Sequence, residues 1–237
     1  MQIIRNANHQ YVISAGAHMT PAAEIYHNSV HAKHAHLRIL TDDYRLLETS
    51  EIIPFIRNAE GLPLQVIISS EKHHCIEFLE RCGFTRRRRC YEMKVSKDDL
   101  KTDLRHIHSI RSASVGDKDY EECCTLLYRY YGQTHAFVCP LTASFEEFCK
   151  SIPDFAYLLR SEDSVLCAAF VEGNELAYVC SESESVFSVF IEEVLGRLFA
   201  SNPEICFEAD DTDWAATVLK RLFLREADTI YDTYVLP

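Results

Sequence analysis

The stretch LAYVCSESESVFSVFIEEVL, residues 176–195, predicts a strand, a loop and a helix in direct succession. Leu176–Cys180 is a short apolar run, residues 181–185 are polar, and an amphipathic run continues from Val186 to about Ala200. The loop therefore leads into a helix N-terminus, where free backbone N–H groups and the helix dipole favour an anion. The same loop carries two glutamates and no glycine, so it does not resemble a simple phosphate-binding loop.

Short apolar runs alternate with amphipathic runs along the whole chain, which predicts an α/β fold with a mixed sheet (α+β). The predicted strands are 2–7, 10–15, 36–40, 64–68, 86–95, 106–113, 155–160, 164–172, 175–180, 205–209, 224–228 and 231–236. The predicted helices are 22–35, 51–59, 71–82, 118–132, 145–152, 186–200 and 212–222. Thr20-Pro21 and Ser50 are expected helix starts, and Ser144 with Glu147 is a capping box.

Charge is unevenly distributed along the 237 residues, although 47% hydrophobic content is ordinary for a globular core. Residues 1–98 hold 13 basic and 11 acidic side chains, and residues 99–237 hold 11 and 25, which gives the net −12. The acidic second part argues against nucleic-acid binding, because phosphate contacts need Lys and Arg. It suits a cationic or amine-bearing partner, or else a merely solubilising surface.

The ten cysteines include no CxxC pair, and residues 1–14 lack the apolar core of a signal peptide. No apolar run approaches the roughly 20 residues that cross a bilayer. We therefore expect reduced, mostly buried cysteines in a cytoplasmic protein with no membrane segment.

Two polar clusters each allow two interpretations. His27 and His31, with His34 and His36 nearby, have zinc-ligand spacing on the predicted helix, but they also fit a solvated polar face. The basic run Arg86–Arg89 is either a phosphate- or partner-binding patch or a strand edge protected by charge.

The chain aligns with itself without a gap at an offset of 140, which places His36–Val95 on Leu176–Val235. Identity alone is near chance, but both segments follow the order strand, acidic loop, helix, Pro, strand, helix, strand. The shared proline, Pro63 and Pro203, precedes a buried strand in each. This repeat predicts a truncated first domain at 1–98, a linker at 99–104 and a complete second domain at 105–237.

The predicted order from His106 to Leu236 resembles the GNAT (N-acetyltransferase) superfamily. Cys75–Val95 resembles that family's ending, with a Gly-Phe pair at Gly83-Phe84 and a Tyr-acid pair at Tyr91-Glu92, which Tyr231-Asp232 repeats. The resemblance implies two GNAT-like domains in tandem, the first truncated. It also implies acetyl-CoA or another acyl-CoA as cofactor and a small-molecule or peptide amine as acceptor.

In that family the cofactor lies between two diverging parallel strands, and a Q/R-x-x-G-x-G/A loop holds its pyrophosphate. The resemblance places these strands at Tyr178–Cys180 and Ile205–Ala209, with the loop pattern on residues 182–187 or, in the first copy, 42–47. In the second copy, Glu182 stands at the Gln/Arg position, Ser185 at the first glycine and Phe187 at the Gly/Ala position. The implied cofactor-binding residues are Val179, Cys180, Ser181, Glu182, Ser183, Ser185, Val186 and Phe187.

The implied catalytic residues are Glu208, as general base, and Tyr178, which would line the cleft. Tyr128, Tyr130, Tyr131 and His135 either bound the acceptor pocket or belong to the core. Two functions fit: an N-acyltransferase with a catalytic second copy, or a catalytically inactive scaffold or ligand-binding protein. An open cleft between the two strands would favour the first, and a cleft filled by side chains such as Phe187 the second.

Overall fold

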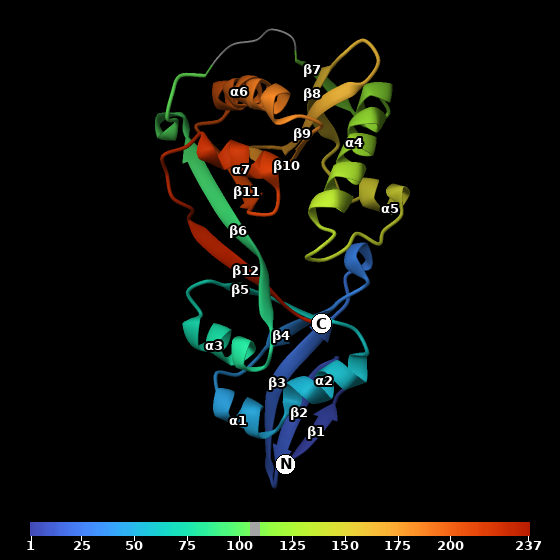
Figure 1. The fold of residues 1–237 in the computed structure, drawn as a ribbon, viewed down its shortest axis with the longest axis vertical. Helices are drawn as coiled ribbons and strands as arrows, with labels where there is room; N and C mark the ends of the chain where they lie inside the picture. The colour runs from blue at the N-terminus through green and yellow to red at the C-terminus, as the bar shows by residue number, and fades with distance from the viewer. Residues whose placement is uncertain (105–109) are drawn as a thin grey trace. The chain divides into compact units, whose positions relative to one another are not determined.

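A computed structural model describes residues 1–104 and 110–237 and divides the chain into two compact units (Figure 1). Unit 1 comprises Met1–Arg88, Phe137–Thr142 and Tyr231–Pro237, and unit 2 comprises Arg89–Ala136 and Ala143–Ile230. No helix among the described residues is long and apolar enough to cross a membrane. The ten cysteines, all among the described residues, form no disulfide bond, and most of them are buried.

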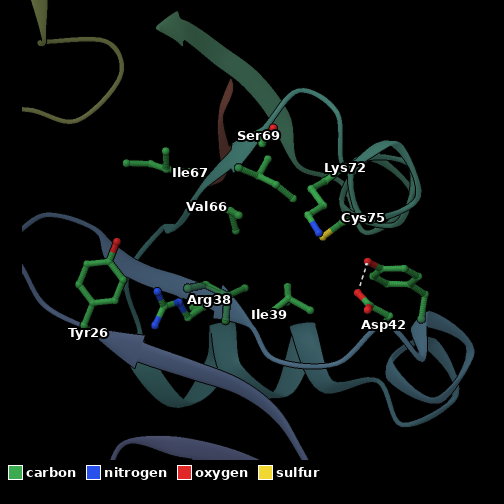
Figure 2. Close-up of a pocket in the computed structure, with 12 residues that line it drawn as sticks. Tyr26, Arg38, Ile39, Asp42, Val66, Ile67, Ser69, Lys72 and Cys75 are labelled. Atoms are coloured by element: carbon green, nitrogen blue, oxygen red, sulfur yellow. Dashed lines mark hydrogen bonds between the residues drawn. The ribbon is translucent and has the colours of Figure 1, made fainter. Parts of the chain in front are cut away.

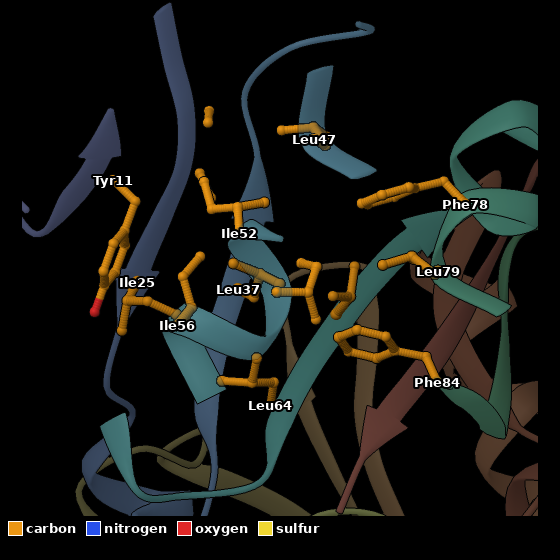
Figure 3. Packing of buried hydrophobic residues seen from close by; sticks show 14 of the residues in the cluster. Tyr11, Ile25, Leu37, Leu47, Ile52, Ile56, Leu64, Phe78, Leu79 and Phe84 are labelled. Atoms are coloured by element: carbon orange, nitrogen blue, oxygen red, sulfur yellow. The ribbon is translucent and has the colours of Figure 1, made fainter. Parts of the chain in front are cut away.

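The strands of unit 1 lie in the order β1-β2-β3-β4-β5-β12, and only β4 and β5 are parallel neighbours. Its strands are β1 (Gln2–Arg5), β2 (Gln10–Ala15), β3 (His18–Tyr26), β4 (Ala35–Ile39), β5 (Leu64–Ser69) and β12 (Thr229–Leu236). Its helices are the 3-10 turn η1 (Ser29–His31), α1 (Tyr44–Thr49), α2 (Ile52–Glu60) and α3 (His73–Arg81). Figure 3 shows Ile56 of α2 and Phe78 of α3 in one buried cluster with Leu37 and Leu64 of the sheet.

The strands of unit 2 lie in the order β6-β11-β10-β9-β8-β7, and only β10 and β11 are parallel neighbours. Its strands are β6 (Thr85–Ser96), β7 (Arg111–Ser114), β8 (Phe155–Arg160), β9 (Val165–Glu172), β10 (Glu175–Ser181) and β11 (Glu204–Asp210). Its helices are the 3-10 turn η2 (Lys97–Asp99), α4 (Lys118–Thr134), α5 (Phe145–Cys149), α6 (Glu184–Ser201) and α7 (Trp214–Arg221).

The strand that ends the first half of the sequence pairs in unit 2, and the strand that ends the second half pairs in unit 1. Strand β6 follows α3 in the sequence, yet Cys90–Ser96 pair with β11 in unit 2. Strand β12 follows α7, yet Tyr231–Leu236 pair with β5 in unit 1. The compact units are therefore not consecutive segments, and the boundaries at 98 and 105 stay a prediction about the sequence repeat.

The elements of the two halves keep the offset of 140. Helices α1 and α6 begin at 44 and 184, and strands β5 and β11 begin at 64 and 204. The first half uses two short helices, α1 and α2, where the second half has the single helix α6. Pro54 explains this break, because it has no N–H to donate to Ser50 and its ring crowds that carbonyl. Glu51, between α1 and α2, has a positive φ of 54°.

Several local predictions are confirmed, and three are wrong. The sequence correctly predicts strands β8 to β11 and helices α3, α4 and α7. It also correctly predicts the β1–β2 hairpin and the Ser144–Glu147 capping box. Residues 22–35 are not a helix: the strand β3 runs through Pro21, which pairs with Val12 beside a register shift. Proline is tolerated in strands at such irregularities, so Thr20-Pro21 is not a helix start.

The other two errors are Ser50, which ends α1 instead of starting a helix, and residues 224–228, which form no strand. The predicted strand 106–113 lies partly outside the described residues, and β7 covers its end.

Candidate active site

The parallel strands β10 and β11 of unit 2 separate soon after they meet. They pair only at Glu175↔Cys206, and β10 has a register shift near its start. Val179 and Cys180 lie beyond the separation and are buried. A parallel pair that diverges in this way leaves facing backbone groups without a ladder partner, which is the geometry that the resemblance predicts for the cofactor cleft.

Serine groups of the loop between β10 and α6 form hydrogen bonds within the loop. Ser181 Oγ accepts a hydrogen bond from the Ser183 N–H at 3.1 Å, and the Ser183 and Ser185 hydroxyls lie 3.0 Å apart. Glu182 forms an ion pair with Arg129 of α4. This pair offsets part of the negative charge that would repel a pyrophosphate.

Aromatic side chains occupy the space next to the start of α6. Phe187 is fully buried, and its ring lies 5.7 Å from that of Trp214 on α7. The Trp214 ring in turn lies 5.7 Å from that of Tyr130 on α4, edge to face. Phe187 and Tyr130 therefore link α6, α7 and α4 through Trp214. Val186, the residue before Phe187, is half-buried.

Asp213 connects this aromatic cluster to the start of α7. Its carboxylate accepts hydrogen bonds from the Ala215 and Ala216 N–H groups at 2.9 and 3.1 Å and from the Tyr130 hydroxyl. The pKa of Asp213 is raised, because the effect of burial exceeds the lowering by its hydrogen bonds. Burial also raises the pKa of Cys180, with smaller contributions from neighbouring thiols and from Asp213. The end of β10 is thus packed against protein groups.

Tyr178 and Glu208 lie close enough to influence each other. Burial raises the pKa of Tyr178, and the charge of Glu208 on β11 raises it further. The Tyr178 ring lies edge to face with Tyr131 at 6.2 Å, and Tyr131 stacks on His135 at 3.7 Å. His135 Nε2 lies 3.7 Å from a carboxylate oxygen of Asp210. Tyr178 thus lies beside Tyr131, which stacks on His135, and Glu208 acts on Tyr178 through its charge.

The other two residues predicted to bound the acceptor pocket lie elsewhere. Tyr128 donates its hydroxyl to the Ala143 carbonyl at 2.9 Å, and its ring contacts Phe148 of α5. Tyr130 belongs to the aromatic cluster with Trp214. Tyr128 is therefore part of the α4–α5 packing.

The corresponding strands of unit 1 are β4 and β5, and a cavity lies between their diverging ends. They pair only at Ala35↔Leu64 and His36↔Gln65. Beyond this point a cavity of about 490 Å³ lies between Leu37–Ile39 and Val66–Ser69. Figure 2 labels five polar residues of its lining, Arg38, Asp42, Ser69, Lys72 and Cys75. Tyr44 also lines the cavity.

The start of α3 contributes Lys72, a second cation of this cavity besides Arg38. Lys72 precedes the first turn of α3 and forms no ion pair with any residue in the described ranges. The Tyr44 hydroxyl donates to Asp42 at 3.2 Å, and burial raises the pKa of both Tyr44 and Cys75. Lys72 and Tyr44 were not predicted as site residues. The sequence repeat contains one signal of a difference between the units. At the offset of 140, the aromatic Trp214 of unit 2 corresponds to the exposed His74 of unit 1.

The histidine cluster does not have the predicted helical arrangement. His34 Nδ1 lies 2.9 Å from Gln65 Oε1, His31 Nδ1 lies 3.3 Å from the Pro140 carbonyl, and His36 stacks on Tyr26. Within the part of the chain that the structure describes, no group of three potential ligands is arranged to hold a metal ion. The Arg86–Arg89 run lies in β6, where successive side chains alternate between faces.

No protein-family model and no curated protein matches the sequence. Solved structures do match: a GCN5-related N-acetyltransferase from Sphaerobacter thermophilus has 12% identity and a TM-score of 0.60, over 97% of this chain and 80% of that one. A GCN5-related N-acetyltransferase from Kribbella flavida has 13% identity and a TM-score of 0.55, over 100% and 89%. A tandem GNAT protein from the clavulanic acid biosynthesis pathway has 8% identity and a TM-score of 0.55, over 96% and 82%.

These similarities establish the fold. The chain has the mixed α+β fold of the GNAT N-acetyltransferases, in agreement with the prediction.

Proposed function

We propose that the protein is an N-acyltransferase that transfers an acetyl or other acyl group from acyl-CoA to an amine, and that its halves are two GNAT-like copies. The observation that carries this proposal is the parallel strand pair that diverges in each unit, β4–β5 and β10–β11. Similarity to GNAT structures over nearly the whole chain supports it. Fold alone does not define an acceptor, so the amine is left open.

The cavity of unit 1 is the better location for the acyl-CoA arm. Its walls include Leu37, Ile39 and Val66, which suit the largely uncharged pantetheine chain. Backbone N–H groups of β4 beyond His36 have no β5 partner and could donate to a thioester carbonyl. Lys72 adds a positive charge beside the start of α3, which would favour the cofactor's phosphates.

The second location is the predicted one in unit 2, with Val179, Cys180, Ser181, Glu182, Ser183, Ser185, Val186 and Phe187 around the cofactor. The observation that favours it is the charge of Glu208, which adds to the effect of burial in raising the pKa of Tyr178. Glu208 would act as a carboxylate base on the strand opposite the acyl group. Phe187 is fully buried against Trp214, so its contact with a cofactor there would require its side chain to move.

Acetyl-CoA binding to matched variants distinguishes the two locations. Ser69→Trp would fill the unit 1 cavity, and Ser185→Trp would obstruct the loop of unit 2. At 100 times its dissociation constant a ligand stabilises the folded state by about 2.7 kcal/mol. We expect a rise in Tm with acetyl-CoA for the wild type and Ser185→Trp but not for Ser69→Trp. The reverse pattern would assign the cofactor to unit 2.

If acetyl-CoA, CoA and longer acyl-CoAs all leave the Tm of the wild type unchanged, the transferase proposal is wrong. Circular dichroism of each variant checks that the fold is retained.

A further inference from the structure

A basic cavity in unit 2 has no role in the proposed acyl transfer. It has a volume of about 740 Å³ and lies beside α7. Four cationic side chains line it: Lys101, Lys220, Arg221 and Arg225. They gather in the part of the chain whose composition is most acidic, with 11 basic and 25 acidic residues from 99 to 237. A local concentration of positive charge there needs a specific explanation.

Backbone contacts bring these cations together from separate segments. Leu100 forms a β-bridge with Phe223, and the Lys101 N–H donates to the Leu222 carbonyl at 2.9 Å. The Leu224 N–H donates to the Asp99 carbonyl at 2.8 Å. The segment after β6 is thereby fixed beside the end of α7, so Lys101 is held near Lys220 and Arg221.

Three of the four cations lack an anionic partner. Arg225 pairs with Asp228 at 2.8 Å, but Lys101, Lys220 and Arg221 form no ion pair with any described residue. The Lys220 amino group instead lies 3.3 Å from the centre of the Tyr91 ring. Burial lowers the pKa of Lys220, and the charges of Arg221 and Lys101 lower it further. The three charges thus repel one another around an open space.

The dipole of α7 does not account for the whole cluster. Lys220 and Arg221 lie in the last turn of α7, where the negative end of a helix stabilises cations. Lys101 comes from another segment, and the dipole gives no reason for a cavity between them. Two carboxylates also line the cavity, Asp211 and Glu226, but neither pairs with the three cations, and Asp211 accepts the Arg89 N–H at 2.9 Å.

We propose that this cavity binds a small phosphorylated molecule. Phosphate groups carry the multiple negative charge that would balance Lys101, Lys220 and Arg221, and the Arg221 guanidinium can bind two phosphate oxygens at once. The volume lies within the range of small-molecule sites. Tyr91 and Phe223 provide an aromatic wall for the rest of the ligand. The proposal is independent of which cleft binds acyl-CoA.

Inorganic pyrophosphate is a suitable first probe, titrated calorimetrically into the full chain at constant ionic strength. Lys101→Gln removes one cavity charge at an exposed position, and Lys150→Gln removes one lysine outside the cavity. We expect saturable binding that is weakened about tenfold by Lys101→Gln and by Arg221→Gln, and not by Lys150→Gln. No binding at millimolar pyrophosphate, or equal weakening by all three substitutions, would overturn the proposal.

Two further arms identify the source of the phosphate. Trp214 is the only tryptophan and begins α7, so its fluorescence reports locally on binding. Displacement of pyrophosphate by CoA would show that the cavity accepts the phosphates of the cofactor. Retention of pyrophosphate in excess CoA would show that it accepts a separate phosphorylated ligand. Circular dichroism and Tm check that each variant is folded.

Discussion

The two units contain the same diverging pair of parallel strands, but the space that follows it differs. In unit 1 it is a cavity of about 490 Å³ beside Lys72. In unit 2 the helix that follows β10 begins with the fully buried Phe187, which packs on Trp214, and Trp214 also contacts Tyr130. The aromatic cluster therefore lies in the half whose sequence predicts the fuller GNAT order, and the cavity lies in the other half.

The difference has a structural cause that can be followed through the offset of 140. Phe187 corresponds to Leu47, and Trp214 corresponds to the exposed His74. Tyr130 has no counterpart, because it comes from α4, which lies between β7 and β8, whereas no α-helix precedes β4 in the described residues 1–34 of unit 1. Unit 2 thus has an additional helix to supply an aromatic side chain, whereas unit 1 has a smaller side chain, Leu47, at the Phe187 position.

The largest effect is expected for Phe187→Ala, which removes the fully buried ring of the aromatic cluster. Loss of a buried phenylalanine should lower the free energy of unfolding by about 3–5 kcal/mol. Denaturant unfolding followed by Trp214 fluorescence measures the change in unit 2. Phe145→Ala, at a phenylalanine that is 39% exposed, is the control and should cost much less. Equal losses for the two variants would mean that Phe187 does not fill a packed site.

The local elements could be read from the sequence because their signals are local. The Ser144–Glu147 capping box and the alternating strands β8 to β10 depend on neighbouring residues, and they lie where expected. Residues 22–35 were assigned wrongly because Thr20-Pro21 has the same signature at a helix start and at a strand irregularity.

The candidate site was only partly predictable for a different reason. The positions of Tyr178 and Glu208 on β10 and β11 follow from the strand order, and their shared role in catalysis stays a prediction. The aromatic cluster depends on the contact between Tyr130 and Trp214. These residues are far apart in the sequence, so no local pattern encodes their contact. The exchange of β6 and β12 between units is likewise a non-local pairing.

The next effect concerns His36, which corresponds to the buried Leu176 of unit 2. Its ring nitrogens have no hydrogen-bond partner among the described residues. Burial lowers the pKa of His36 from 6.5 to about 4, with smaller effects from His31, His34 and His27. Between these pH values the unfolded chain binds more protons, so stability falls as the pH drops from 6.5 to 4, by about 2–3 kcal/mol.

His36→Leu, which introduces the residue of the second copy, should remove this part of the pH dependence. Urea unfolding at pH 7 and pH 4.5 gives the comparison, with the exposed His74→Leu as the control. A wild-type and a His36→Leu protein that lose the same stability between the two pH values would contradict a neutral, buried His36.

A smaller effect is expected for Tyr130→Phe, which keeps the ring and removes the hydroxyl. Asp213 would lose one of its hydrogen bonds in a buried position, which costs about 1–2 kcal/mol. Tyr91→Phe is a matched control, because Lys220 contacts the Tyr91 ring and not its hydroxyl. Thermal unfolding should separate the two variants, and a Tyr130→Phe protein as stable as Tyr91→Phe would show that the Asp213 contact adds nothing.

The smallest effect is expected at the loop of unit 2, for Arg129→Gln. Exposed ion pairs contribute little, so loss of the Glu182 pair should change the free energy of unfolding by less than about 1 kcal/mol. Its value lies in a second readout, the affinity for acetyl-CoA. If the cofactor binds in unit 1, Arg129→Gln leaves the affinity unchanged while Lys72→Gln lowers it. If it binds in unit 2, the uncompensated Glu182 repels the pyrophosphate, and the pattern is reversed.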